Sequence, residues 1–300
     1  MNLKSLLKVN SLSVSYRIKG AYIPVVDQVS FTINQGEILA IVGESGCGKS
    51  QLALALAGLS PKSARIDSDI DGDTMTVAMI FQEPLSALNP LMTVGKQIRE
   101  GLAKKHLPAN EQVIKLLSAV GIPEPEVRCK QYPHEFSGGM RQRALIAMAL
   151  AREPDLLIAD EPTTALDVTI QAQIIALLKK LNQERKLSIL FITHDLSLLE
   201  SFAHRVAVMY AGRIVEIATI QEIFNHPKHP YTSALINLAR LQKDENGLFP
   251  SIPGSVPPPH EYPQGCRFHP RCPRRTDACA VEIPVLSGGN DHLWACPVVK

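Results

Sequence analysis

Apolar and polar residues alternate in two segments near the start of the chain, and such alternation is typical of strands with one buried face. The two segments are Leu12–Tyr16 and Val29–Ile33. Gly36 marks a turn, and the continuous apolar run Ile38–Val42 predicts a strand buried on both faces of a parallel sheet. A glycine-rich loop and a helical pattern over Lys49–Leu59 follow.

The next part of the chain also alternates between helical and strand patterns. Residues 94–152 are mainly helical, and a buried strand is predicted over Leu156–Ala159. A helix over Ile170–Gln183 leads to strands over Ile189–Thr193 and Val206–Tyr210. Because strands and helices alternate, the predicted fold class is α/β, with a parallel sheet covered by helices on both faces.

The composition argues against a protein that binds nucleic acid. Hydrophobic residues make up 45% and charged residues 20% of the 300 residues, and the formal net charge is +2. This balance gives no electrostatic footprint for nucleic acid. Aromatic residues make up only 5% of the chain, which argues against a surface that stacks on bases.

The longest apolar runs, Ala144–Ala151 and Ile189–Ile192, are too short to cross a bilayer. The opening MNLKSLLKVN lacks the features of a signal peptide, so the chain is expected to stay in the cytoplasm.

Proline and histidine become frequent from His226 onward, and Pro253–Pro263 is rich in proline. Four of the six cysteines also fall in this last part of the chain. The shift predicts a core domain over residues 1–225, with a helical subdomain over about residues 88–152, and a C-terminal extension over residues 226–300.

The segment between the strand Ile38–Val42 and the following helix matches the phosphate-loop pattern in full. Its residues are Gly43, Glu44, Ser45, Gly46, Cys47, Gly48, Lys49 and Ser50. The glycines let successive backbone N–H groups face the phosphates, and the helix N-terminus adds partial positive charge. In such a loop Lys49 reaches the β- and γ-phosphates and the Ser50 hydroxyl ligates Mg²⁺. The sequence therefore predicts a site for ATP and Mg²⁺, against the alternative of a glycine-rich turn with a chance match.

Two acidic residues follow the buried strand Leu156–Ala159. Asp160 can hold Mg²⁺ through water, and Glu161 is placed to polarise the attacking water. Many strands end in solvated acidic residues, so the pair has this meaning only because a phosphate loop precedes it.

A third segment gives the chain a resemblance to the ATP-binding cassette (ABC) family. Its residues Phe136, Ser137, Gly138, Gly139 and Met140 read FSGGM and resemble the family's signature motif, which is more often LSGGQ. A Ser-Gly-Gly sequence at a helix N-terminus is a second anion-binding site. One ATP needs only one such site, so two in one chain imply a nucleotide held between two subunits. The resemblance implies a P-loop (RecA-like) ABC nucleotide-binding domain with a helical subdomain and a C-terminal extension rich in cysteine and proline.

Other features occur in the family's order, and each takes its role from the resemblance. Gln82 resembles the Q-loop glutamine, which senses Mg²⁺ and touches the membrane subunit, and His194 resembles the switch histidine that contacts the γ-phosphate. Thr164–Asp167 resembles the D-loop at the dimer interface. Tyr16 stands where the family has an aromatic residue under the adenine ring, and Gln51 joins the nucleotide-binding set. The resemblance thus implies Glu161, His194 and Gln82 as catalytic residues, and Ser50, Gln82 and Asp160 as Mg²⁺ ligands.

Longer strings resemble the importers of oligopeptides, dipeptides and nickel within this family. They are Phe81–Pro90, Tyr132–Phe136, His229–Thr232, Gly265–Phe268 and Arg271–Pro273. The resemblance implies an ATPase that powers peptide uptake from the cytoplasmic face of the inner membrane, as a peripheral subunit. The implied partners are a second, related ATPase subunit, two transmembrane permease subunits and an extracytoplasmic substrate-binding protein.

The sequence leaves alternatives open. Nickel or metal-chelate import and antimicrobial-peptide uptake compete as the cargo. A non-transport ABC ATPase and a regulatory module that binds ATP without hydrolysis are the rival classes. The sequence does not distinguish an identical second ATPase subunit from a different one.

Two departures from the family pattern carry expectations of their own. The stretch from Gly58 to Ala78 is shorter than in related proteins, which usually build a small antiparallel sheet near the adenine there. Nucleotide affinity or base selectivity is therefore expected to differ. Cys47 replaces the commoner serine, and a thiol within the phosphate loop is expected to be sensitive to oxidation. Gln51 also stands where a small or hydroxyl residue is frequent.

The four cysteines of the tail are Cys266, Cys272, Cys279 and Cys296, separated by five, six and sixteen residues. This spacing does not match the closely paired cysteines of zinc sites. Four thiolates can hold an iron–sulfur cluster, and the resemblance implies a [4Fe–4S] cluster on these residues. The cluster would help to fold an extension with little apolar area of its own. Four reduced thiols, some of them packed in a small core, are the alternative.

Overall fold

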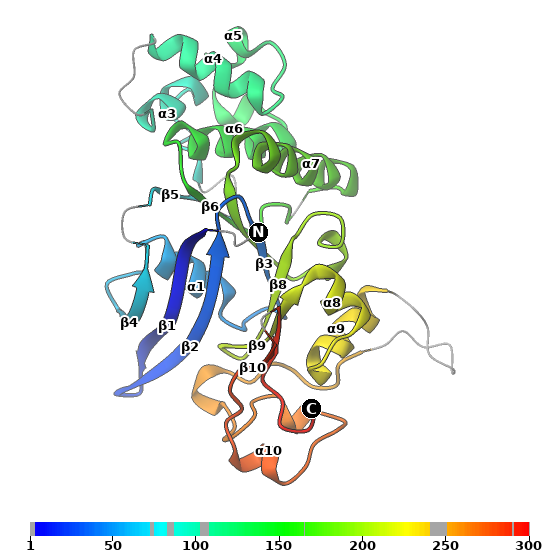
Figure 1. Cartoon of the computed structure of the whole chain (residues 1–300). Coiled ribbons are helices and arrows are strands. Elements are labelled where there is room, and N and C mark those ends of the chain that lie inside the picture. The colour runs from blue at the N-terminus through cyan, green and yellow to red at the C-terminus, as the bar shows by residue number, and fades with distance from the viewer. Residues whose placement is uncertain are drawn as a thin grey trace. The chain divides into compact units, whose positions relative to one another are not determined.

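The computed structural model describes residues 4–72, 75–82, 87–102, 108–164, 166–240, 251–289 and 291–299. The chain forms two compact units (Figure 1). Unit 1 comprises Met1–Asn34, Ile38–Asp73 and Phe191–Lys300, and unit 2 comprises Gln35–Glu37 and Thr74–Leu190. Both units combine helices and strands, which confirms the predicted α/β class.

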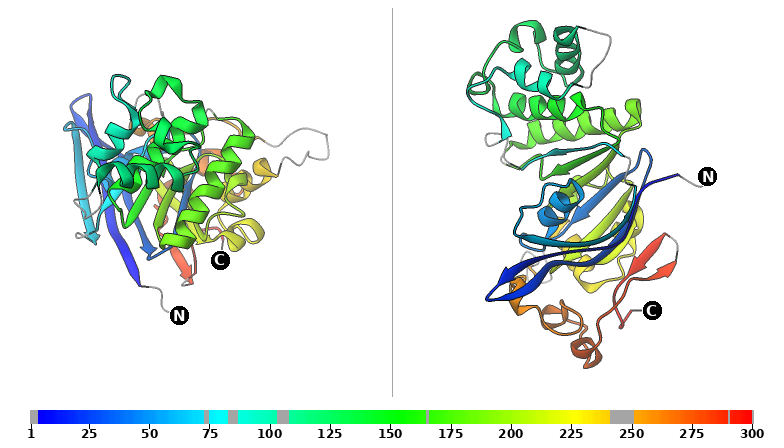
Figure 2. Two further views of the ribbon diagram at one scale, coloured as in Figure 1. Left: turned by 90° about the horizontal axis from the view of Figure 1, so that it is seen from above. Right: turned by 90° about the vertical axis from the view of Figure 1, so that its left-hand side faces the viewer.

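Unit 1 contains a three-stranded antiparallel sheet. Its strands, in spatial order, are β2 (Ala21–Asn34), β1 (Ser5–Ile18) and β4 (Ala64–Asp71). Lys8 of β1 lies opposite Thr32 of β2 on one side and opposite Asp71 of β4 on the other. β1 and β2 are each 14 residues long, well beyond the predicted segments, and the right-hand view of Figure 2 shows them as one long pair.

The segment between Gly58 and Ala78 supplies β4, so the small antiparallel sheet is retained despite the short connection. β4 pairs with β1 from Lys8 to Tyr16. Residues 73 and 74 of this segment lie outside the described residues. An effect of the short connection on nucleotide binding stays a prediction.

A second group of strands in unit 1 leads into the phosphate loop. β3 (Ile38–Val42) has the predicted bounds and pairs in parallel with β8 (Arg205–Tyr210). β8 is antiparallel to β9 (Arg213–Thr219), which pairs with β11 (His292–Trp294), and β11 pairs with β10 (Ser287–Gly289). All five residues of β3 are buried, as expected for a strand covered on both faces.

The helices of unit 1 are short. They are α1 (Lys49–Leu56), α8 (Ile220–Asn225), α9 (Pro230–Ala239) and α10 (Ala278–Val281), with 3-10 turns at Leu196–Leu198, Pro259–Glu261 and His269–Arg271. α1 ends three residues before the predicted Leu59 because Gly58 takes a φ of +68°. The N–H of Leu59 then donates to the carbonyl oxygen of Leu54 at 2.8 Å, which closes the helix in a Schellman arrangement.

Unit 2 combines a pair of parallel strands with a group of helices. β5 (Val77–Ile80) and β6 (Leu156–Asp160) run in parallel, with Val77 opposite Leu156. The helices are α3 (Val94–Glu100), α4 (Ala109–Ala119), α5 (Pro125–Arg128), α6 (Gly138–Ala151) and α7 (Val168–Arg185), with a 3-10 turn at Pro133–Glu135. α3 and α4 pack against α6, so the predicted helical content of residues 94–152 is confirmed. β7 (Ser188–Thr193) begins in unit 2 and ends in unit 1.

The C-terminal extension belongs to unit 1, where β9 anchors it. The buried carboxylate of Glu216 in β9 accepts backbone N–H bonds from Lys228 (2.7 Å) and His229 (2.8 Å), and it lies 2.6 Å from Nε2 of His292. Unit 1 thus holds residues on both sides of the predicted boundary at residue 225, and that boundary stays a prediction.

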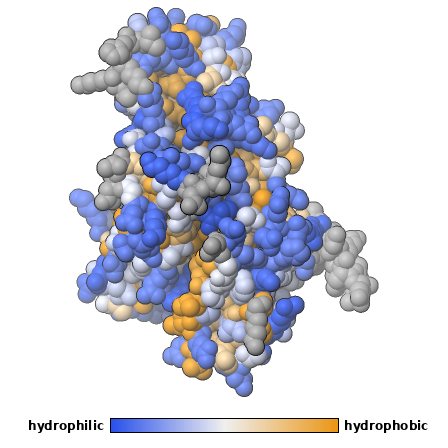
Figure 3. Space-filling view, viewed as in Figure 1, coloured by the Kyte–Doolittle hydropathy of each residue, from blue (hydrophilic) through white to orange (hydrophobic). Residues whose placement is uncertain are grey.

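Hydrophobic residues are scattered among hydrophilic ones over the face shown in Figure 3. Exposed large apolar residues in the extension include Val281, Ile283 and Val285. Within the described ranges, every helix falls short of the length and apolar character that crossing a membrane requires.

Candidate nucleotide-binding and hydrolysis site

The phosphate loop lies in unit 1 between β3 and α1, and two of its glycines stand where any side chain would collide. A Cβ atom added to Gly43 would lie 2.1 Å from the carbonyl oxygen of Met209 in β8. One added to Gly48 would lie 2.8 Å from the carbonyl oxygen of Val25 in β2, and the φ of +104° at Gly48 also favours glycine. Neighbouring backbone therefore sets the shape of the predicted loop.

Lys49 directs its ammonium group into the loop. The side chain is buried, and Nζ donates to the carbonyl oxygens of Gly43 at 2.8 Å and Glu44 at 3.0 Å. Contact of this ammonium group with the phosphates of a nucleotide stays a prediction. Ser45 and Gly46 are exposed at the tip of the loop, and Ser50 is half-buried in the first turn of α1.

Cys47 is less accessible than the sequence suggested. It is fully buried, and burial raises the pKa of its thiol despite the nearby ammonium of Lys49. The thiolate is the reactive form, so a buried thiol with a raised pKa is inert. The prediction of an oxidation-sensitive Cys47 is therefore wrong in this conformation.

Tyr16 and Gln51, predicted separately, are brought together in unit 1. The hydroxyl of Tyr16 on β1 donates to Oε1 of Gln51 in α1. Tyr16 thus lies beside the first turn of the helix that follows the phosphate loop. Its stacking under an adenine ring stays a prediction.

His194 directly follows β7 and is exposed. The buried Thr193 accepts a hydrogen bond at Oγ1 from the N–H of Asp195 at 3.0 Å, which fixes the backbone on either side of the histidine. An exposed imidazole at the end of a buried strand can reach a bound phosphate. Its role toward the γ-phosphate is a prediction.

Glu161 in unit 2 is held by two neighbours. Its Oε2 accepts hydrogen bonds from Nε2 of Gln82 at 3.1 Å and from Oγ1 of Thr164 at 3.0 Å. Its φ is +45°, an uncommon value for a residue other than glycine, which often marks a functional position. Two predicted catalytic residues thus meet at one carboxylate. Thr164, which was named only as the start of the D-loop, is a further contact that the sequence did not reveal.

Asp160 lies at the end of β6, where the sequence placed it, and the structure shows that it is buried. The Mg²⁺ roles of Asp160, Ser50 and Gln82 stay predictions. Residues 83–86 of the string Phe81–Pro90 and Ala165 of the D-loop lie outside the described residues. The last D-loop residue, Asp167, caps α7 by accepting the N–H of Ile170 at 2.9 Å.

The signature segment begins α6 in unit 2. Ser137 is the N-cap, and its hydroxyl accepts the N–H of Met140 at 3.3 Å. Ser137 and Gly138 are exposed, as an anion-binding helix start requires, whereas Gly139 is buried. A Cβ atom on Gly139 would lie 2.8 Å from Cγ2 of Ile170, so close packing of α7 also explains this glycine.

The four tail cysteines lie close enough to influence one another. Burial and the charges of the other three thiolates raise the pKa of Cys266 to about 11, although the backbone of Phe268 opposes the shift. Burial also raises the pKa of Cys272. The N–H of Cys266 donates to the carbonyl oxygen of Cys279 at 2.8 Å, which joins two of the thiol-bearing segments.

The tail cysteines fit a metal cluster by chemistry but not by arrangement. Four thiols are a suitable donor set for iron–sulfur clusters. Among the described residues, however, no three His, Cys, Asp or Glu side chains are placed to hold a metal ion together. The raised pKa values favour protonated thiols, which a metal would have to deprotonate.

Two contacts to the phosphate loop were missed by the sequence analysis. The N–H of Glu44 donates to the hydroxyl of Tyr231 in α9 at 2.9 Å, and the carboxylate of Glu44 forms an ion pair with Arg271. Tyr231 and Arg271 both stand in strings that carried the family resemblance. Only the folded chain shows which element they touch.

Comparison with known proteins follows the same division of the chain. The family model described as ABC transporter matches residues 26–164, and the one described as oligopeptide/dipeptide transporter, C-terminal region, matches residues 215–279. The dipeptide transport ATP-binding protein DppD of Escherichia coli (strain K12) is 46% identical over an alignment 306 positions long, which covers 94% of this chain and 93% of that protein. DppD of Bacillus subtilis (strain 168) is 46% identical over an alignment 318 positions long, which covers 98% of this chain and 95% of that protein.

A solved structure supports the assignment of the cassette. The dimeric structure of MJ0796, a bacterial ABC transporter cassette, matches with a TM-score of 0.61 and 26% identity, covering 71% of this chain and 98% of that one. The two DppD matches span the phosphate loop, the signature segment and the extension alike. The chain therefore belongs to the ABC transporter family, as an ATP-hydrolysing subunit of its oligopeptide and dipeptide transporter branch.

Proposed function

We propose that this subunit powers the uptake of dipeptides or oligopeptides across the cytoplasmic membrane. The observation that carries the proposal is the extension, because it matches the family model described as the C-terminal region of oligopeptide/dipeptide transporters. The named relatives that match over nearly the whole chain are dipeptide transport proteins, which supports the same cargo.

Two anion-binding helix starts in one chain support a nucleotide sandwich. The phosphate loop lies in unit 1 and the signature segment in unit 2, and each has exposed residues at its tip. In the proposed dimer, Lys49 and Ser50 of one subunit and Ser137 and Gly138 of the other approach the same ATP. The dimeric state of the MJ0796 cassette supports this arrangement. The second subunit is proposed to be a related ATPase.

Hydrolysis in this proposal depends on positioning and charge. Mg²⁺ that arrives with ATP supplies positive charge at the phosphate oxygens, and Asp160, Ser50 and Gln82 would hold it. Glu161 orients and polarises the attacking water, while Gln82 and Thr164 fix its carboxylate. His194 contacts the γ-phosphate, and Lys49 neutralises phosphate charge.

The proposed partners follow from transport. Two transmembrane permease subunits would carry the peptide, and an extracytoplasmic binding protein would select it. In this proposal the subunit is a peripheral protein at the inner face of the membrane, and the surface around Gln82 faces the permease.

The tail cysteines are proposed to hold a [4Fe–4S] cluster. The donor chemistry of four thiols and the family resemblance support this assignment, although the described side chains are not arranged to hold a metal ion. Anaerobically purified chain should contain roughly four iron atoms and visible absorbance, both lost in Cys272→Ser. Cys129→Ser, outside the tail, is the matched control and should change neither value. Iron content near zero in the wild type and in both variants would contradict the cluster and favour four reduced thiols instead.

The cargo is tested by reconstituting the complete transporter in vesicles. Uptake of a radiolabelled dipeptide should require ATP and should be lost in Glu161→Gln. Glu184→Gln, an exposed residue of α7, should transport like the wild type. ATP-dependent uptake of nickel without uptake of any dipeptide would overturn the peptide proposal while leaving the ATPase assignment intact.

A further inference from the structure

The carboxylate of Glu44, the second residue of the phosphate loop, is paired with an arginine from the C-terminal extension. Nη1 of Arg271 lies 2.8 Å from Oε2, and Nη2 lies 3.0 Å from Oε1. Only 6% of the Arg271 side chain and 28% of the Glu44 side chain is exposed. A two-pronged pair of this kind is stronger and better oriented than a single surface contact.

Arg271 is itself held rigidly by the extension. Its Nε donates to the carbonyl oxygen of Pro253 at 2.8 Å, and Nη2 donates to that of Ile252 at 3.1 Å. The guanidinium carbon also lies 5.7 Å from the ring centre of Tyr210 in β8. Because its other donors are occupied, these contacts orient the guanidinium group toward Glu44. Arg271 presents a fixed positive group to the loop.

The backbone of Glu44 is tied at both ends. Its N–H donates to Tyr231, and its carbonyl oxygen accepts Nζ of Lys49 at 3.0 Å. Tyr231 packs edge-on against Tyr210, with ring centres 4.7 Å apart, and against Phe268 of the extension at 5.2 Å. The extension therefore reaches the phosphate loop both by charge and by packing.

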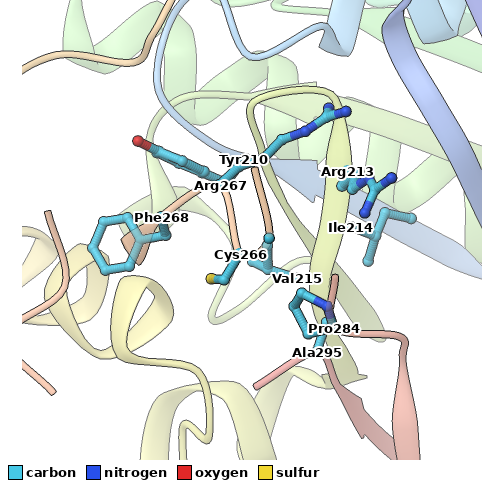
Figure 4. A pocket seen from close by; sticks show the side chains of 10 residues that line it. Tyr210, Arg213, Ile214, Val215, Cys266, Arg267, Phe268, Pro284 and Ala295 are labelled. Carbon is cyan, nitrogen blue, oxygen red and sulfur yellow. The ribbon is translucent and has the colours of Figure 1, made fainter. Parts of the chain in front are cut away.

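A second arginine supports the loop indirectly. Arg267 forms an ion pair with Asp27 and donates to the carbonyl oxygen of Ala211. The N–H of the next residue, Gly212, donates to the carbonyl oxygen of Cys47 in the phosphate loop at 2.8 Å. Figure 4 shows a pocket that Arg267 lines together with Tyr210 of β8, Ile214 and Val215 of β9, and Cys266 and Phe268 of the extension.

We propose that Arg271 is a positioning residue for ATP binding, which neutralises Glu44 and fixes the phosphate loop. ATP brings several negative charges next to this loop. With Arg271 removed, a carboxylate without its cation would stand beside those phosphates, and the loop would lose an anchor. This inference rests on the proposed binding of ATP at the phosphate loop. It adds a second role for the C-terminal extension, which would then also set the affinity for ATP.

The test is equilibrium binding of radiolabelled ATP with Mg²⁺ to the full-length chain, in a Glu161→Gln background that prevents turnover. Arg271→Met should raise the Kd for ATP about tenfold, which corresponds to about 1.4 kcal/mol. Arg275→Met, an exposed arginine of the same extension, should leave the Kd unchanged. Lys49→Ala should abolish binding, and if it does not, the assignment of the phosphate loop fails before that of Arg271.

The decisive variant is the double substitution Glu44→Gln with Arg271→Met. Removal of the carboxylate relieves the repulsion, so the double variant should bind ATP more tightly than Arg271→Met alone. A purely structural role for Arg271 predicts no recovery, and that result would overturn the proposal. So would an Arg271→Met chain with wild-type affinity. If Arg271→Met does not fold, Arg271→Lys keeps the charge without the two-pronged geometry and should raise the Kd two- to fivefold.

Steady-state kinetics provide an independent readout in the assembled transporter with Glu161 intact. Arg271→Met should raise the KM for ATP and leave kcat within a factor of two, because the hydrolytic residues are untouched. A fall in kcat with an unchanged KM would contradict a positioning role in binding.

Discussion

The phosphate loop of unit 1 and the signature segment of unit 2 are both glycine-rich helix starts, but different contacts hold them. The phosphate loop is shaped by backbone from other strands, since Gly43 faces Met209 and Gly48 faces Val25. The signature segment is capped by its own neighbours, and side chains rather than backbone limit its glycines, since a Cβ atom on Gly139 would meet Ile170 of α7. Ser137 caps α6 locally, and the carboxylate of Glu135 accepts the N–H of Tyr132 at 2.7 Å just before it.

This difference shows that a motif match locates a site without revealing what maintains its shape. The phosphate loop depends on the packing of β2, β8 and the extension, so damage far away in sequence should reach it. The signature segment, whose glycines face side chains that can adjust, should respond less strongly to added bulk. The two glycine-rich segments should therefore differ in sensitivity to mutation.

The largest effect is expected at Gly43. Gly43→Ala places a Cβ atom 2.1 Å from a backbone carbonyl, which cannot move aside, so the free energy of unfolding should fall by about 3 kcal/mol or more. Gly46→Ala is the matched control, because Gly46 has a φ of +82° and open space around its Cβ position. It should cost about 1–2 kcal/mol, from backbone strain alone. Equal losses in urea unfolding of the two variants would contradict the crowded packing.

A smaller effect is expected from Gly139→Ala in the signature segment. The new Cβ atom would meet a side-chain methyl of Ile170 rather than backbone, so the side chain can adjust and the loss should be about 2 kcal/mol. Gly138→Ala, whose Cβ atom would lie 3.6 Å from Leu166, should cost less. Chemical denaturation of both variants measures the difference, and a larger loss in Gly138→Ala would reject the packing explanation for Gly139.

The free energy of unfolding should fall in acid because His229, the N-cap of α9, is buried in its neutral form. Burial lowers the pKa of His229 to about 3, whereas the unfolded chain keeps a value near 6.5. Below about pH 6.5 the unfolded chain binds a proton that the folded chain does not, so stability present at neutral pH is lost as pH falls toward 3. His229→Asn should reduce the loss between pH 7 and 5 by about 1–2 kcal/mol. The exposed His226→Asn is the control, and an equal effect of both would exclude His229 as the cause.

The smallest effect is expected at the cap of α6. Ser137→Ala removes the hydroxyl that accepts the N–H of Met140, which should cost about 1 kcal/mol. Ser137→Asp should restore most of this stability, because aspartate is also a good N-cap. ATP hydrolysis should stay low in Ser137→Asp, because the added negative charge repels the phosphates. Recovery of both stability and hydrolysis would argue against an anion-binding role for this helix start.

Sequence patterns predicted the parts of the fold that depend on local residues. The bounds of β3 follow from an uninterrupted apolar run, and α6 begins where Ser137 can cap it. β1 and β2 proved much longer than predicted because their ends are held by pairing with each other, which alternation does not record.

The candidate site shows the same limit. Motifs identified Glu161 and Gln82 but not that Gln82 and Thr164 share its carboxylate. Cys47 was misjudged because exposure of one residue in a loop depends on distant packing. Arg271 carried no signal of its role, since an arginine in a proline-rich tail has no periodicity and its partner lies at the other end of the chain.

The catalytic role of Glu161 is tested by the rate of ATP hydrolysis by the assembled transporter with Mg²⁺, compared between wild type and Glu161→Gln. Glu161→Gln should bind ATP normally and lose hydrolysis by at least about a hundredfold, because the water is no longer polarised. Glu184→Gln should hydrolyse ATP at the wild-type rate. Hydrolysis that persists at the wild-type rate in Glu161→Gln would contradict the assignment of Glu161 and, with it, the proposed mechanism.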